Sequence, residues 1–231
     1  MREPIVFIPG LLCDELVYAP QIAAFADHPI LIANHRDHGS IREIAASILE
    51  AGPERFALIG LSMGGYIAME IMRVAPGRVT RLSLLDTNAR PDTPDQTERR
   101  LFLIELARKK DFKKIPHLLF PGFVHQSRED DEQLRAIVVE MAMTTGPDAF
   151  IRQQTALINR IDSRPHLAAI DCPALVVVGE GDRLTPPELS EEIHALIPRS
   201  CLAVIRGSGH LSTLEEPAQT TSVLKSWMES S

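Results

Sequence analysis

A serine flanked by glycines is the residue of this chain whose setting best suits covalent chemistry. It lies in the segment GLSMG at residues 60–64, after an apolar run at 56–59 and before an apolar stretch at 63–75 that is rich in helix formers. A G-x-S-x-G pattern between a strand and a helix is typical of a nucleophile elbow, a sharp turn that presents the serine hydroxyl for attack. The glycines permit close backbone approach, and the first N–H groups of the helix would favour negative charge nearby. We therefore predict that Ser62 is a nucleophile.

A serine hydroxyl is a weak nucleophile, so a base and an acid must accompany it. The base is usually a histidine that a carboxylate orients. Asp182 and His210 each follow an apolar run within a glycine-containing loop, in the order serine, acid, histidine that goes with this elbow. We predict a triad of Ser62, His210 and Asp182. Glu180 and Asp86 are the alternatives for the acid, although Asp86 could instead cap a turn.

The other histidines have settings that suit a base less well. His35 and His38 lie in the loop at residues 34–40, and we expect them to shape that loop or to line the rim of the site. The rest lie in or beside a helical segment or in polar surroundings: His28, His117, His125, His166 and His194.

Acyl chemistry also needs donors for the oxyanion that forms when a carbonyl is attacked. One donor should be the backbone N–H of Met63, the residue after the nucleophile. The second should come from the loop at residues 9–14, where Gly10 gives the backbone room to turn. We predict the Leu11 N–H for this role, with the Leu12 N–H as the alternative.

The composition is that of a soluble globular domain. The chain has 231 residues, is 45% hydrophobic and 24% charged, and carries a formal net charge of −7. This length fits one domain with a sizeable insertion, and this charge argues against nucleic acid. No apolar run suits a membrane span or a signal peptide, so we expect a cytoplasmic protein without membrane partners. The three cysteines are too few and too scattered for a disulfide framework or a metal site. We expect Cys13, Cys172 and Cys201 to be small, buried side chains in the core.

Strand-like and helical segments alternate along the chain. Continuous apolar runs, which predict strands buried on both faces of a parallel sheet, lie at residues 5–8, 29–33, 56–59, 82–85, 174–178 and 202–205. Helical patterns lie at 41–51, 63–75, 187–197 and 216–229. This alternation predicts a doubly wound α/β fold.

One stretch breaks this alternation. Residues 90–161 contain no strand pattern, and helical patterns lie at 95–110, 131–144 and 147–160, with a weaker one at 111–120. We predict a helical cap, or lid, over a core made of residues 1–89 and 162–231, because ligands bind beyond the carboxyl ends of such sheets. Apolar residues suggest a substrate pocket lined by Leu12, Phe120, Phe123 and Met141.

Taken together, these segments resemble the α/β-hydrolase family along nearly the whole chain. The matching segments are IPGL at 8–11, RDHGS at 36–40, GLSMGG at 60–65, GEGD at 179–182 with TPP at 185–187, and GH at 209–210. The Ser62 segment looks most like a small bacterial branch that includes esterases and enol-lactonases. The resemblance implies a Ser-His-Asp acyl-enzyme mechanism without a metal or a cofactor. Some members carry the acid at the position of Asp86.

The chain departs from the family pattern in two places. The family usually has His-Gly where this chain has Pro9-Gly10, which keeps the backbone donor but loses the histidine side chain. The family also usually begins with an antiparallel hairpin, whereas this chain starts at the first parallel strand. We therefore expect about six parallel strands without that hairpin, and one sheet edge that needs cover from a helix or a partner chain.

The expected activity is that of a serine hydrolase. The substrate would be a small carboxylic ester, lactone or thioester, cleaved through an acyl-enzyme. A carbon–carbon bond hydrolase with the same triad and a slow-turnover ligand-binding protein on the same fold are the alternatives. The expected partner is a small acyl substrate, and the sequence leaves open whether the chain is a monomer or a homo-oligomer.

Overall fold

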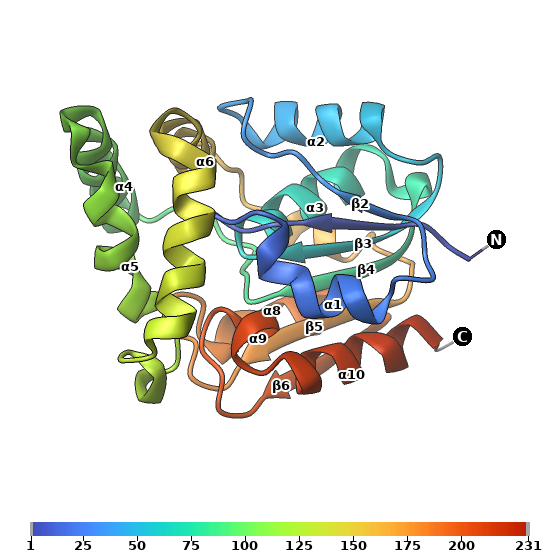
Figure 1. The fold of residues 1–231 in the computed structure, drawn as a ribbon. Coiled ribbons are helices and arrows are strands. Elements are labelled where there is room, and N and C mark those ends of the chain that lie inside the picture. The colour runs from blue at the N-terminus through green and yellow to red at the C-terminus, as the bar shows by residue number, and fades with distance from the viewer. Residues whose placement is uncertain (1, 230–231) are drawn as a thin grey trace.

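The computed structural model describes residues 2–229 and shows one six-stranded sheet in that part of the chain (Figure 1). The strand order is β2-β1-β3-β4-β5-β6, and every neighbouring pair is parallel. The strands are β1 Ile5–Ile8, β2 Ile30–Ile32, β3 Phe56–Leu61, β4 Val79–Leu85, β5 Ala174–Gly179 and β6 Ser200–Ile205. The predicted doubly wound sheet of about six parallel strands is therefore confirmed. No antiparallel pair occurs within residues 2–229.

Helices cover both faces of the sheet. One face packs against α2 (Ile41–Ala51), α3 (Met63–Val74), α7 (Arg164–Leu167) and α8 (Pro187–Leu196). The other face packs against α1 (Ala19–Ala24) and α10 (Pro217–Glu229), with α9 (Ser212–Glu215) beside them. Side chains alternate along each strand, so Val6 and Ile8 of β1 enter the first core and Ile5 and Phe7 enter the second.

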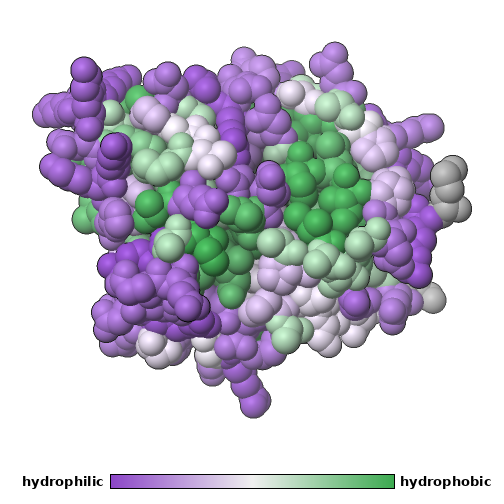
Figure 2. Space-filling view, viewed as in Figure 1, coloured by the Kyte–Doolittle hydropathy of each residue, from purple (hydrophilic) through white to green (hydrophobic). Residues whose placement is uncertain are grey.

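The two outer strands are only partly covered. The strands β1, β3 and β5 are buried along their whole length, as predicted, but β2 is half-buried and β6 exposes Val204 to 46%. Figure 2 shows a hydrophobic area between α1 and α2, where β2 is the outermost strand. The prediction of burial on both faces is wrong for these edges, because helices pack mainly over the middle strands. Cys201 on β6 is exposed for the same reason, whereas Cys13 and Cys172 are buried as expected.

Three helices from residues 94–158 lie beyond the carboxyl ends of the strands. They are α4 (Pro94–Leu106), α5 (Ile115–Phe123) and α6 (Glu132–Ile158), and Figure 1 shows them stacked on the side to which the strand arrows point. Helix α4 begins with a capping box between Thr93 and Gln96. The two helices expected at 131–144 and 147–160 form the single element α6, bent where Gly146 adopts a φ of 77° before Pro147.

Within residues 2–229, no helix has the length and apolarity that crossing a membrane requires. The same residues contain no group of three or more His, Cys, Asp or Glu side chains arranged to hold a metal ion.

Candidate active site

Ser62 occupies a strained turn between β3 and α3. Its φ and ψ are 53° and −111°, a left-handed conformation that is uncommon for a residue with a side chain, and its N–H donates to Leu85 O at 2.9 Å. A methyl group added to Gly60 would overlap the backbone of Gly64, and one added to Gly64 would overlap Ile8 O. Both glycines are therefore required for β3, α3 and β1 to approach so closely.

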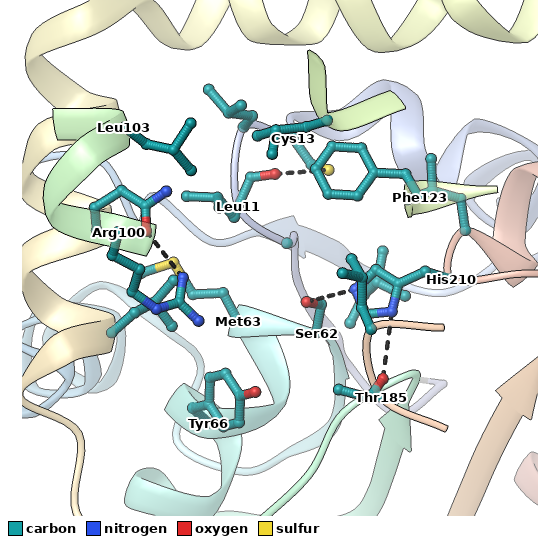
Figure 3. A pocket seen from close by; sticks show the side chains of 18 of the residues that line it. Leu11, Cys13, Ser62, Met63, Tyr66, Arg100, Leu103, Phe123, Thr185 and His210 are labelled. Carbon is teal, nitrogen blue, oxygen red and sulfur yellow. Dashed lines mark hydrogen bonds between the residues drawn. The ribbon is translucent and has the colours of Figure 1, made fainter. Parts of the chain in front are cut away.

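The three residues predicted as a triad meet at this turn (Figure 3). His210 Nε2 lies 2.8 Å from Ser62 Oγ, and His210 Nδ1 lies 2.7 Å from Asp182 Oδ2. The Asp182 carboxylate also accepts the backbone N–H groups of Leu184 and Thr185 at 2.8 and 3.0 Å. Because the carboxylate accepts from Nδ1–H, Nε2 of the neutral ring is left free to accept the serine proton.

The charges of this pair support each other. Burial disfavours the protonated imidazole, but the Asp182 carboxylate outweighs burial and raises the pKa of His210 above its usual value. Burial likewise opposes ionisation of Asp182, but the charge of His210 and the hydrogen bonds outweigh it and lower the pKa of that carboxyl. The raised pKa of His210 and the lowered pKa of Asp182 agree with each other. Both mean that this pair stabilises the protonated, positively charged imidazole.

The alternative acids have other partners. Asp86 Oδ1 accepts Gly179 N–H at 2.8 Å, and Asp86 Oδ2 accepts the Ser212 hydroxyl. Glu180 accepts Gly207 N–H at 3.2 Å. Asp182 is thus the carboxylate that lies against the imidazole of His210.

The loop after β1 passes close to the serine, since a methyl group added to Gly10 would lie 3.5 Å from Ser62 Cβ. Gly10 O accepts from His35 Nε2 at 2.9 Å and from Cys13 N–H at 3.1 Å. A trans peptide points its carbonyl and its N–H in opposite directions, so fixing Gly10 O directs the Leu11 N–H away from His35. Leu12 N–H is already engaged by Gln153 Oε1 at 3.2 Å, which leaves Leu11 as the available donor of this loop.

The contact of His35 with this loop differs from the prediction that His35 shapes its own loop or lines the rim of the site. His35 is 1% exposed, and burial lowers its pKa from 6.5 to about 4, so the ring is neutral. A carbonyl only accepts, so the proton must sit on Nε2. No signal in the sequence links residues 25 positions apart in this way.

A cavity of about 150 Å³ opens beside Ser62. Three of the four residues predicted to line a pocket do so: Leu12, Phe123 and Met141. Phe120 does not. It is fully buried in the core, with the Arg135 guanidinium 4.9 Å above its ring. Polar residues that the sequence did not single out line the same cavity, among them Tyr66, Arg100 and Gln154.

Comparison with known proteins places this geometry in context. A model of the alpha/beta hydrolase family matches residues 5–223. The RutD protein of Serratia proteamaculans, described as a candidate carbamate hydrolase, is 26% identical over 99% of this chain and 91% of its own length. A thermophilic esterase from Thermogutta terrifontis, solved with malate bound, superposes with a TM-score of 0.92 at 27% identity, covering 99% of this chain and 90% of that one. The enol-lactonase of Burkholderia xenovorans superposes with a TM-score of 0.89 at 22% identity, covering 100% and 92%, which shows a shared fold.

Proposed function

Since this chain belongs to the alpha/beta hydrolase family, and its relatives and structural neighbours support hydrolase activity, we propose that it cleaves small carboxylic esters or lactones through a serine acyl-enzyme. The observation that carries the proposal is the chain of contacts from Ser62 Oγ to His210 Nε2 at 2.8 Å and from His210 Nδ1 to Asp182 Oδ2 at 2.7 Å. Ser62, at the end of this series of contacts, lines a cavity large enough for a small acyl group.

In the first half of the proposed reaction, His210 takes the proton of Ser62 as the hydroxyl oxygen attacks the carbonyl carbon. Asp182 holds the imidazole in the required tautomer and stabilises its positive charge. The N–H groups of Met63 and Leu11 would hold the oxyanion. As the tetrahedral intermediate collapses, His210 gives its proton to the leaving alcohol, and the acyl group stays on Ser62.

In the second half, His210 takes a proton from water, and the hydroxide attacks the acyl carbon. Collapse returns the proton to Ser62 and releases the acid. The helices α4, α5 and α6 would cover the bound substrate and limit access of bulk water.

The experiment compares wild type with Ser62→Ala for labelling by a fluorophosphonate probe and for hydrolysis of short p-nitrophenyl esters. The control is Ser226→Ala, which removes an exposed hydroxyl on α10 that donates to Ser222 O. We expect wild type and the control to label and turn over. We expect Ser62→Ala not to label and to lose roughly three to six orders of magnitude in kcat. Labelling of Ser62→Ala, or turnover near that of wild type, would refute the proposal.

A further inference from the structure

One end of the cavity is polar, in contrast to its otherwise apolar lining. The polar residues come from separate elements: Tyr66 from α3, Arg100 from α4 and Gln154 from α6. In Figure 3, Tyr66 and Arg100 lie on the Met63 side of Ser62, whereas His210 lies on the other side. This arrangement sets the polar end apart from the histidine that acts on the serine.

Gln154 lines this cavity and carries a buried donor that has no partner in residues 2–229. Its Oε1 accepts from Arg100 Nη1 at 2.9 Å, and this orientation is fixed because a guanidinium only donates. Its amide Nε2 therefore faces away from Arg100. Within residues 2–229 this Nε2 has no hydrogen-bond partner, although the residue is only 1% exposed and lines the cavity. A buried donor without a partner is costly, and an acceptor group of a ligand bound in this cavity would remove that cost.

Tyr66 contributes a second free proton. Asn88 Oδ1 accepts Arg90 N–H at 2.9 Å, so the Asn88 amide nitrogen must be the group that donates to Tyr66 Oη at 2.8 Å. Tyr66 Oη is thus an acceptor in that bond and keeps its own proton for another partner. The polar end therefore offers donors and has its acceptors already engaged.

Positive charge exceeds negative charge at this end. Arg100 Nε donates to Asp92 Oδ2 at 2.7 Å, and Arg160 pairs with the same carboxylate, whose side chain is 1% exposed. The Arg160 guanidinium also lies 4.5 Å over the Tyr66 ring. Two guanidinium groups thus share one carboxylate. Among the residues described, no Asp or Glu lines the cavity, whereas Arg99 adds a further cation to the lining.

We propose that Tyr66, Arg100 and Gln154 form a subsite for a carboxylate of the substrate, so that the preferred substrates are small esters or lactones carrying a second, free carboxylate. This inference rests on the proposed hydrolase function and names its substrate class. A carboxylate is acceptor-only and anionic, which matches a set of donors with surplus positive charge. A cavity of about 150 Å³ in another protein holds a benzene-sized ligand, so the bound acid should be short.

The test compares each methyl half-ester of succinate, glutarate and adipate with the neutral methyl ester of equal chain length. Hydrolysis is followed by pH-stat, and the readout is the ratio of kcat/KM for the acid to that for the neutral ester. We expect a ratio of about tenfold or more for at least one pair in wild type, which corresponds to about 1.4 kcal/mol. Gln154→Glu keeps an oxygen toward Arg100 but replaces the free NH₂ with an anionic oxygen, and should reduce the ratio to within about twofold of unity. Tyr66→Phe should lower the ratio by about threefold.

The control is Arg108→Gln, which lowers the net charge by one, as Gln154→Glu does, at an exposed residue just beyond α4 that is paired with Glu105. It should leave both the ratio and the activity unchanged. Hydrolysis of neutral esters in wild type with ratios near unity would refute the subsite and leave the hydrolase function standing, as would a Gln154→Glu variant that keeps the wild-type ratio.

A calorimetric titration of glutarate into Ser62→Ala tests the carboxylate subsite independently of the hydrolase function, because binding requires no turnover. Binding that is lost in Ser62→Ala combined with Gln154→Glu supports the subsite even where no ester is cleaved. Absence of binding to Ser62→Ala counts against it.

Discussion

The buried contact between His35 and Gly10 makes a prediction about catalysis at a residue outside the triad. His35→Phe keeps an aromatic ring but removes the donor to Gly10 O, leaving only the Cys13 N–H at 3.1 Å to hold that carbonyl. Complete loss of one oxyanion donor costs roughly 10²–10³ in kcat. Because Cys13 still holds the peptide in part, we expect a fall in kcat of about ten- to a hundredfold with little change in KM.

His35→Gln is the matched variant, since a glutamine amide can still donate to Gly10 O. We expect it to recover kcat to within about threefold of wild type. The assay is steady-state hydrolysis of a short p-nitrophenyl ester, with all variants compared at the same slightly alkaline pH. Equal losses in the phenylalanine and glutamine variants would show that ring packing, and not the donor, matters. An unchanged kcat in His35→Phe would refute the argument that this hydrogen bond directs the Leu11 N–H.

The same residue predicts a dependence of stability on pH. Burial lowers the pKa of His35 to about 4 in the folded chain, whereas the unfolded chain has the ordinary value of 6.5. The unfolded state therefore binds more protons as the pH falls below 6.5, and its stabilisation is worth about 1.4 kcal/mol per pH unit. Between about pH 7.5 and about pH 5 the loss from this group amounts to about 2 kcal/mol. His35→Gln lacks this titration, so its unfolding free energy should fall by about 2 kcal/mol less over that interval. Chemical denaturation at both pH values measures this difference. An equal fall in the unfolding free energy of wild type and His35→Gln would contradict the prediction.

Two further predictions concern the base and the elbow. The raised pKa of His210 places the acid limb of the kcat/KM profile above pH 6.5, and Asp182→Asn should move that limb to lower pH while reducing kcat by about 10⁴; a limb that stays in place would contradict the assigned contact. Gly64→Ala forces a methyl group against Ile8 O and should lower both stability and kcat, whereas Gly77→Ala, with open space around it, should change neither; thermal unfolding and ester hydrolysis measure the difference, and equal effects would refute the packing argument.

The parts of the fold that follow from local signals could be predicted from the sequence. The strands β1 to β6 are apolar runs, and the elbow at Ser62 depends on glycines within two residues of it, so both are visible in a short window. Edge strands were harder, because a run such as β6 has the composition of a buried strand and its exposure depends on which helices pack beside it. The Gly146-Pro147 pair marked a break correctly, but tertiary packing carries α6 through it as a bend.

The polar contacts of the site could not be predicted in the same way. His35 meets Gly10 across 25 positions, and Arg100 meets Gln154 across 54. Each pair joins two different elements, and its formation depends on how the helices beyond the sheet sit on the strands. Only residues that the fold always delivers to a strand end, such as Asp182 and His210, carry a signal in their position along the chain.

Asp86 and Asp182 show why the sequence alone did not decide among its three candidates for the acid, of which Glu180 was the third. Both follow neighbouring parallel strands, so both reach the same edge of the sheet beside His210. Two carboxylates there would repel each other and would hold His210 protonated, which would prevent it from acting as a base. The structure resolves the conflict by unequal solvation. Burial and the charge of Asp182 raise the pKa of Asp86 to about 8, leaving it mostly protonated at neutral pH, whereas Asp182 stays ionised against the imidazole. The carboxylate that contacts Nδ1 is then the main negative charge acting on the imidazole, and Glu215 adds a weaker one.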